Sequence, residues 1–328
     1  KYDPTYIIGG KINNAGNSKL GSSDYLIAEA DESDASFLHL QPLMSIITNI
    51  DKDHLENHKN SFDVLKKNFL KFISNLPFYG LCLLNLNDIN TKSIINKISR
   101  PFKTYGLDIL ADYNGKTLNI NSIPSTFIYT ENDTEYEIKS NMPGRYNAMN
   151  SLAALSLARE LGIPIKTIQK AIESFPGISR RFEIHGEFEV NNKKFTWVDD
   201  YGHHPTEIKE VLETINNVWK EQRVVMVFQP QRYSRTAEYF SKFVDTLKNV
   251  QDLILMEIYS ANEREIENII SSALVEEISK YGVNVVLINN HKKLKNFISQ
   301  TIKNNDILLT MGAGDISKFN NYFKESIK

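Results

Sequence analysis

The protein is a chain of 328 residues, of which 41% are hydrophobic and 24% are charged. This length predicts two domains, and the hydrophobic content is enough for two cores, which excludes a disordered chain. The 38 basic and 40 acidic residues leave a net charge of -2, which disfavours a general nucleic-acid binder. A single cysteine excludes a disulfide framework. The single cysteine also fits a reducing cytoplasm, where we expect the protein. No apolar stretch approaches the roughly 20 residues of a membrane-spanning helix, so we expect a soluble protein with no membrane partner.

The first half of the chain predicts an α/β domain in which antiparallel hairpins extend a parallel sheet. It opens without an initiator Met on the strand-like run Tyr6-Ile7-Ile8, so we expect an N-terminal portion to be missing. Between two strand patterns, Phe62, Leu65 and Phe69 recur at helical spacing. The expected strands are residues 25–30, 45–50 and 80–86; hairpins are expected over 111–142, and helices over 147–161 and 165–175.

Pro176-Gly177 breaks the chain after the second of these helices. We therefore expect one domain over residues 1–178 and another over residues 179–328. After a hairpin over 182–198, strands and helices alternate, which predicts a Rossmann-like, doubly wound sheet with ligands beyond the carboxyl ends of its strands. The expected helices are 206–219, 237–247, 269–281, 294–302 and 316–327, and the expected strands are 224–228, 253–258, 285–288 and 307–310.

Two acidic clusters follow strands of the first half. One runs from Glu29 to Asp34, and the other contains Asp51, Asp53 and His54. Carboxylate oxygens are ligands that Mg2+ prefers, and two strand ends lying side by side in a parallel sheet converge on one metal. The alternatives are a solvated acidic loop that caps the next helix and a surface or capping role for His54. The paired occurrence favours the metal site.

In the second half, the turn between a strand and a helix contains two acids and two imidazoles, in the run from Asp199 to His204. The residues after it, Pro205 and Thr206, have structural explanations as a turn residue and a helix cap. The polar residues before them have no such explanation in the sequence, so a binding or acid–base role is favoured. These are Asp199, Asp200, His203 and His204.

Two later strand ends carry groups that suit an anion. Arg232 and Arg235 are placed to clamp a carboxylate or phosphate, although an exposed helix start is the alternative. Cations in a first helical turn oppose the helix macrodipole, which makes the structural explanation weaker. The last strand ends in Gly312-Ala313-Gly314, which permits close approach of an anion and equally suits a tight turn.

The sequence contains no complete phosphate-binding loop of the form GxxxxGK[ST]. Gly115-Lys116-Thr117 has Leu110 where the first glycine is required, and the residues after it alternate as in a strand. Gly10-Lys11 is followed by Ile12 and fails as well.

Taken in order along the chain, these clusters resemble the Mur ligase family. The matching runs cover nearly the whole chain, and Asp-Asp-Tyr-Gly-His-His-Pro is typical of the family member that uses L-alanine. The runs are residues 28–37, 48–54, 75–80, 143–147, 179–182, 199–207, 228–233 and 312–314.

The resemblance implies three domains: an N-terminal one for a UDP-sugar, a central ATPase domain and a C-terminal, Rossmann-like domain for the amino acid. By that pattern this chain begins inside the central domain, after the phosphate-binding loop, and lacks the N-terminal domain; alone it is expected to be inactive. The implied reaction belongs to peptidoglycan precursor synthesis. ATP phosphorylates the carboxylate of UDP-N-acetylmuramate, and the amine of L-alanine attacks the acyl phosphate.

The resemblance also implies roles for individual residues. Glu29 and His54 would hold Mg2+, and Lys66, or its neighbour Lys67, is the candidate for the lysine that sister ligases carbamylate. Tyr146 stands where the family more often has His. Catalytic roles are implied for Asp200, His203, Arg232 and Lys66, cofactor contacts for Asn147, Arg181, Tyr201 and His204, and substrate contacts for Arg235, Gly312 and Gly314.

The expected cofactors are therefore ATP and Mg2+, and the expected partners are UDP-N-acetylmuramate and L-alanine, with a homodimer left open. No nucleic-acid or membrane partner is expected. The alternative function is a nucleotide- or ligand-binding module without turnover. A dinucleotide-dependent dehydrogenase is a third interpretation, but no dinucleotide fingerprint lies near the first strand.

Overall fold

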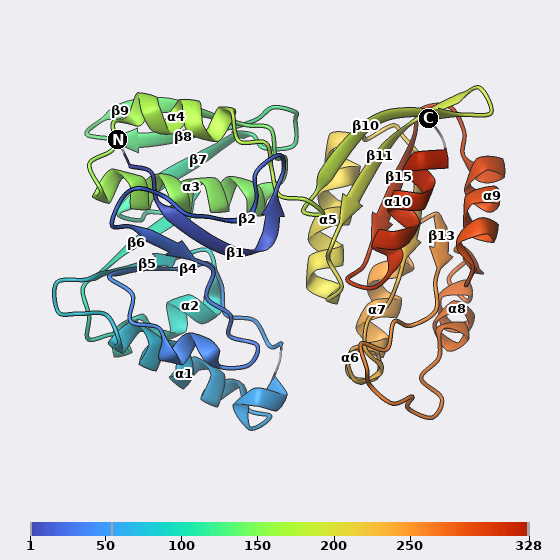
Figure 1. The fold of residues 1–328 in the computed structure, drawn as a ribbon, viewed down its shortest axis with the longest axis horizontal. Helices are drawn as coiled ribbons and strands as arrows, with labels where there is room; N and C mark the ends of the chain where they lie inside the picture. Colours follow the sequence, from blue (N-terminus) through green and yellow to red (C-terminus); the bar gives the residue numbers. More distant parts are fainter. Residues whose placement is uncertain (1, 54, 327–328) are drawn as a thin grey trace. The chain divides into compact units, whose positions relative to one another are not determined.

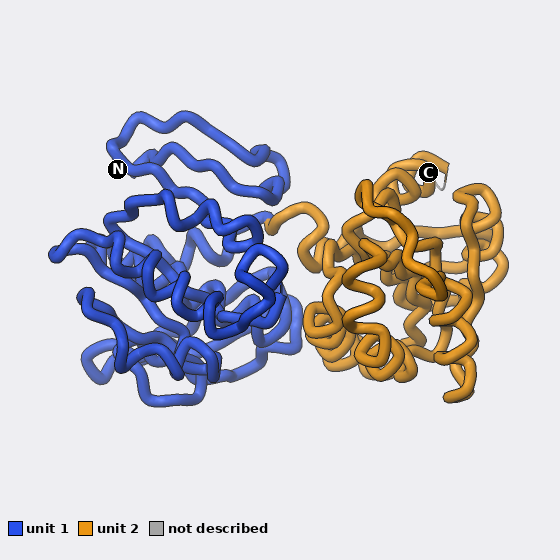
Figure 2. The backbone as a smooth tube through the Cα atoms, turned by 90° about the horizontal axis from the view of Figure 1, so that it is seen from below, with its two compact units in different colours: residues 1–176 blue, residues 177–328 orange. Residues whose placement is uncertain are grey.

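The computed structural model describes residues 2–53 and 55–326. The chain divides into two compact units, Lys1–Pro176 and Gly177–Lys328, which are coloured separately in Figure 2. Among the described residues, no helix combines the length and the apolar character needed to cross a membrane.

The larger sheet of the first unit has six strands in the order β4-β5-β6-β7-β8-β9 (Figure 1). Its first four strands are parallel, and β8 and β9 extend them as antiparallel hairpins, as the sequence predicts. Gly115-Lys116-Thr117 lies within β7 and not in a loop. The bounds are β4 (Met44–Ile47), β5 (Leu81–Asn85), β6 (Phe102–Leu107), β7 (Tyr113–Asn119), β8 (Ser125–Glu131) and β9 (Thr134–Ser140).

Helices cover both faces of this sheet, and the alternation of β5 shows how. Cys82 and Leu84 pack with Leu65 of α1, whereas Leu83 packs with Leu152 of α3 on the other face. The 3-10 helices η1, η2 and η3 lie in the loops. The bounds are η1 (Ser36–His39), η2 (Leu55–His58), α1 (Phe62–Ser74), α2 (Ile89–Ile94), η3 (Ile95–Lys97), α3 (Arg145–Glu160) and α4 (Ile165–Glu173).

A separate three-stranded sheet, in the order β2-β1-β3, completes the first unit. It contains β1 (Thr5–Ile12), β2 (Gly16–Lys19) and β3 (Leu26–Ala28). The strand before the first acidic cluster, β3, pairs with β1, whereas β4, before the second cluster, pairs with β5. The expectation that these two strands lie side by side in one parallel sheet is therefore wrong.

The sheet of the second unit has the order β10-β11-β15-β12-β13-β14. Only the edge strand β10 is antiparallel to its neighbour. The carboxyl ends of β11, β15 and β12 are consequently adjacent, and the loops that follow them carry the polar clusters. The bounds are β10 (Glu183–Val190), β11 (Lys193–Asp200), β12 (Val224–Phe228), β13 (Asp252–Leu255), β14 (Asn284–Leu287) and β15 (Asp306–Met311).

Two layers of helices enclose this sheet in separate apolar clusters. One cluster includes Ile208, Phe243 and Leu274 of α5, α7 and α8, and the other includes Leu294 and Phe319 of α9 and α10. This arrangement confirms the doubly wound α/β fold. The helix expected over 237–247 is interrupted at Tyr239, because α6 ends before this residue and α7 begins after it. The bounds are α5 (Pro205–Val218), α6 (Tyr233–Glu238), α7 (Phe240–Leu247), α8 (Ser271–Ser279), α9 (His291–Thr301) and α10 (Ile316–Ser326).

Candidate functional site

The predicted metal ligand Glu29 directly follows β3 and is exposed. Its Oε2 accepts a hydrogen bond of 2.7 Å from the backbone N–H of Gly9 in β1. The other predicted ligand, His54, lies outside the described residues. Their joint role at a metal therefore stays a prediction.

A buried histidine that the sequence analysis did not single out connects the acidic loop to α1. His58 of η2 is fully buried, and its Nδ1 lies 2.8 Å from the amide nitrogen of Asn68. With that amide donating to Nδ1, the Nε2–H donates to the carbonyl of Glu32, also over 2.8 Å. Asn57 donates to the Ser33 carbonyl. These bonds hold the first acidic loop beside η2, although β3 and β4 belong to different sheets.

Lys66, the predicted catalytic lysine, is half-buried on α1, whereas its neighbour Lys67 is exposed. The Lys66 Nζ lies 4.6 Å from the centre of the Phe62 ring. Lys52, in the segment after β4, contacts the same ring at 5.3 Å. Lys66 and Lys52 of the second acidic cluster thus contact one ring, and the choice of Lys66 over Lys67 stays a prediction.

The predicted adenine contact, Asn147, lies in the first turn of α3 and is 5% exposed. Its side-chain amide donates to the carbonyl of Pro143 over 2.8 Å. The amide thus fixes the entry to the helix, and a contact with adenine stays a prediction.

In the second unit, the two aspartates at the end of β11 have structural partners. Asp199 forms an ion pair of 2.9 Å with Arg180 and accepts a hydrogen bond of the same length from Thr310. Asp200 accepts backbone hydrogen bonds from Phe182 and Gly202, of 2.7 and 2.6 Å. The expectation that these residues lack a structural explanation is therefore wrong. Burial of the Asp200 carboxyl raises its pKa to about 6, and these two N–H groups act in the opposite direction.

His204 also has a structural explanation, because it caps α5. Its Nδ1 accepts from the Thr206 N–H over 3.3 Å, and Glu207 reaches back to the His204 N–H over 3.1 Å, which completes a capping box. Glu207 also accepts from the backbone of His203 over 2.9 Å. Burial acts to raise the pKa of Glu207, but the nearby His203 and these N–H groups lower it overall.

Cationic and aromatic side chains gather beside this turn. The guanidinium groups of Arg180 and Arg181 each lie 5.4 Å from the centre of the Tyr201 ring. His203 packs edge-on against that ring, with its Nδ1 at 3.2 Å from the Tyr201 carbonyl. An Arg181 nitrogen lies 3.5 Å from Glu207. The structure thus brings together, in and beside this turn, the predicted residues Asp200, Tyr201, His203, His204 and Arg181.

Arg232 and Arg235 follow β12, two strands along the sheet from β11. Arg232 occupies the N-cap position of α6, and its Nε lies 3.4 Å from Glu263. Arg235 is 6% exposed and donates to the side chain of Gln231. The alternative of an ordinary exposed helix start therefore does not fit Arg235.

Gly312, after β15, lies between these two groups of residues. Its N–H donates to the Asp200 carbonyl over 3.1 Å, and its carbonyl accepts from Arg180 over 2.6 Å. The residues predicted from three strand ends therefore share one edge of the sheet.

A second cluster of potential metal ligands, Glu183, His185 and Asp199, lies nearby in the described part of the chain. Its carboxylates already have partners, since Arg180 pairs with Asp199 and donates its backbone N–H to Glu183. Burial lowers the pKa of His185, whose ring packs 4.5 Å from that of Trp197. We interpret this cluster as part of the scaffold.

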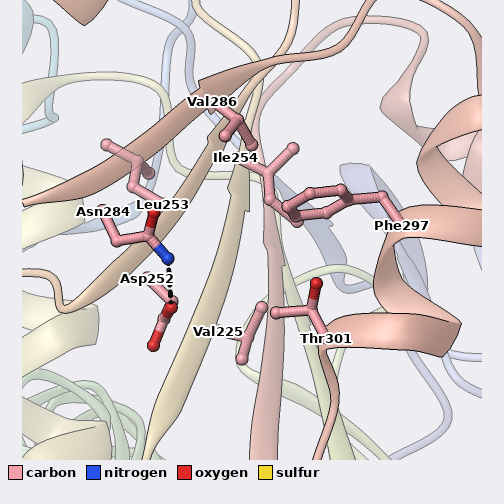
Figure 3. Close-up of a pocket in the computed structure, with 8 residues that line it drawn as sticks. All are labelled: Val225, Asp252, Leu253, Ile254, Asn284, Val286, Phe297 and Thr301. Carbon is pink, nitrogen blue, oxygen red and sulfur yellow. Dashed lines mark hydrogen bonds between the residues drawn. The ribbon is translucent and has the colours of Figure 1, made fainter.

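A small pocket lies between the sheet of the second unit and α9 (Figure 3). Asp252 and Asn284, which are hydrogen-bonded to each other over 2.8 Å, begin β13 and β14, and Phe297 and Thr301 line the helix side. The pocket therefore reaches the amino ends of these strands and contains none of the predicted site residues.

Comparison with known proteins identifies the family. Residues 16–158 match the Mur ligase middle domain, and residues 180–314 match the Mur ligase, glutamate ligase domain. The chain belongs to the Mur ligase family.

The relatives within this family are more specific. The chain is 46% identical over 320 residues to the UDP-N-acetylmuramate–L-alanine ligase of Vesicomyosocius okutanii, covering 96% of this chain and 68% of that protein. Identity is 41% to the enzyme of the same name from Hydrogenovibrio crunogenus, covering 98% and 71%. The crystal structure of the UDP-N-acetylmuramate-alanine ligase of Thermotoga maritima superposes with a TM-score of 0.79 at 26% identity, covering 99% and 69%.

Proposed function

We propose that the protein is an ATP-dependent ligase that joins L-alanine to UDP-N-acetylmuramate in peptidoglycan precursor synthesis. ATP converts the muramyl carboxylate into an acyl phosphate, and the alanine amine then displaces phosphate. The observation that carries this function is the 46% identity to a relative of that name over 96% of the chain. UDP-N-acetylmuramate and L-alanine are accordingly the proposed substrates, and the cytoplasm is the proposed setting.

The residues at the carboxyl ends of β11, β12 and β15 support roles in binding and orientation. Asp200 and His203 are proposed to reach the γ-phosphate and the incoming amine, because Asp200 ends β11 and His203 lies in the turn that follows it. Arg232 and Arg235 are proposed to orient carboxylates, which planar guanidinium groups bind through paired hydrogen bonds. Fixed charges of this kind stabilise phosphoryl transfer more than covalent help does.

ATP and Mg2+ are the proposed cofactors. The donor chemistry of the acidic loop fits Mg2+, since Glu29 and its acidic neighbours offer hard oxygen ligands and hydrogen bonds from His58 and Asn57 hold this loop in place. When bound, the ion supplies positive charge beside the phosphates. Glu29, together with His54, is proposed to hold it.

Phosphate release tests the proposal. The full gene product, meaning residues 1–328 with whatever further residues its gene encodes, should release phosphate from ATP only when UDP-N-acetylmuramate and L-alanine are both present. No release under these conditions would refute the ligase function. Light scattering on the same preparation tests whether a homodimer forms.

Residues 1–328 alone are proposed to be inactive, because they contain no complete phosphate-binding loop. The alternative function, a binding module without turnover, predicts tight binding of Mg-ATP to these residues. Calorimetry with Mg-ATP distinguishes the two, since the ligase proposal predicts weak binding when that loop is absent.

A further inference from the structure

One buried amide, Gln229, connects the loops that follow β12, β13 and β15. Gln229 comes directly after β12 and is 4% exposed. Its Nε2 donates to Asp315 over 2.6 Å and to the Glu257 carbonyl over 3.4 Å. Its Oε1 accepts the N–H of Ile316 over 2.8 Å. The side chain is thus fixed by two segments that are distant in sequence.

The glycines of the turn after β15 pack directly against this residue. A Cβ on Gly312 would lie 2.5 Å from the Gln229 carbonyl oxygen, and the φ of +141° disfavours any other residue. A Cβ on Gly314 would overlap the Gln229 Oε1 and lie 2.7 Å from the Cβ of Tyr259. Glycine is therefore required at both positions because a larger residue would collide with Gln229.

Backbone hydrogen bonds connect Gln229 and the loop of Arg232, which follows it, to the neighbouring segments. The Gln229 N–H donates to the Met311 carbonyl over 3.0 Å, which sets β12 against the end of β15. Three residues later, the Arg232 N–H donates to the Tyr259 carbonyl over 2.8 Å. Since the Gln229 side chain also binds Asp315 and Ile316, just after the glycines, we expect a shift of this side chain to move the glycine turn relative to Arg232.

We propose that Gln229 is a positioning residue of the ligase: its side chain fixes the Gly312–Gly314 turn against the loop of Arg232 and so sets the geometry in which L-alanine is bound. This inference rests on the proposed function. An amide is required because the site needs a donor toward Asp315 and an acceptor for the Ile316 N–H at the same time. A glutamate at this position would keep the acceptor but bring a second carboxylate against Asp315.

Charge-swapping variants of the full gene product test the pairing. In Gln229→Glu, the KM for L-alanine should rise at least tenfold, while the KM for ATP stays within twofold. Asp315→Asn should remain within twofold of wild type, because the asparagine oxygen still accepts from Gln229. The double variant should recover most of the loss, since the asparagine amide then donates to the glutamate. Gln300→Glu makes the same change on the exposed side of α9 and should leave all constants unchanged.

Two kinetic outcomes would overturn the inference. One is a double variant no better than Gln229→Glu; the other is an equal rise of KM for every substrate together with a lowered melting temperature, which indicates a general structural role. An inactive wild type would refute the proposed function instead. Hydrogen exchange of residues 312–316 needs no turnover, and exchange in Gln229→Glu no faster than in wild type would also overturn the inference.

Discussion

At the scale of single residues, the Asp200 carboxyl links the predicted site to a measurable property. Its pKa is raised to about 6 because the group is buried. In the unfolded chain the carboxyl returns to an ordinary pKa near 4. The folded state therefore binds more protons between these values, and its stability falls as the pH rises through that range.

We expect the contribution of the Asp200 carboxyl to the free energy of unfolding to be largest below about pH 4. This contribution should fall by about 3 kcal/mol as the pH rises through about 6. Urea unfolding at pH values from 4 to 8 measures the effect. In Asp200→Asn the dependence should be markedly flatter, whereas Asp245→Asn, on the exposed side of α7, should keep the wild-type slope. An unchanged slope in Asp200→Asn would contradict the assignment.

The pair Lys66 and Lys67 offers a matched test of the lysine prediction. Because Lys66 is half-buried and shares the Phe62 ring with Lys52 of the second acidic cluster, Lys66→Ala should lower phosphate release by the full gene product at least tenfold. Lys67→Ala, the adjacent and exposed control, should stay within twofold of wild type. Equal losses in the two variants would remove the basis for preferring Lys66.

The residue scale also shows where sequence reasoning stops. The sequence indicates the clusters around Asp200 and Arg232, because in each of them several polar residues follow a strand together. The sequence gives no comparable signal for Gln229 and His58, since the importance of each depends on burial and on hydrogen-bond partners that no local pattern singles out. The Asp315 partner of Gln229 lies 86 residues away. No local pattern reports such a pairing.

At the scale of secondary structure elements, the start of α5 combines a cap with the proposed site. Glu207 accepts the backbone N–H groups of His203 and His204, which satisfies two donors at the helix start. Glu207→Ala should lower the free energy of unfolding of the second unit by about 1 kcal/mol. Urea titration followed by tryptophan fluorescence measures it.

Glu207→Gln is the control for charge, because glutamine retains an oxygen that accepts these N–H groups. It should lose clearly less stability than the alanine variant. If both variants lose the same amount, the charge and not the cap accounts for the effect.

Most elements could be predicted from periodicity, because long amphipathic helices and buried parallel strands have clear patterns. The assignment of strands to sheets could not. β3 and β4 both read as apolar runs followed by acids, and only the pairing of β3 with β1 places them in different sheets. Periodicity also does not indicate the break between α6 and α7 at Tyr239, because apolar residues continue at helical spacing across residues 237–247.

At the scale of the whole molecule, the two units carry separate probes. Both tryptophans, Trp197 and Trp219, belong to the second unit, and the single cysteine, Cys82, is buried in the first. Burial raises the pKa of the Cys82 thiol to about 11, so it should resist labelling at pH 8 until the first unit unfolds.

We therefore expect fluorescence and thiol labelling to report two different transitions in one denaturant titration. Phe243→Ala, in the core of α7, should lower the fluorescence midpoint and leave the labelling midpoint unchanged. Phe69→Ala, in the core of α1, should have the opposite effect. If both midpoints moved together in either variant, the units would not unfold independently.

The close packing of Gly312 and Gly314 against Gln229 also limits which substitutions can be accepted at these three positions during evolution. A lineage that replaces Gln229 alone breaks its bond to Asp315, and one that replaces either glycine alone meets a steric barrier. In homologous proteins, these three residues should consequently be either all retained or substituted together. A set of homologous sequences in which Gln229 varies freely while both glycines persist would argue that the fit has been relaxed elsewhere in the family.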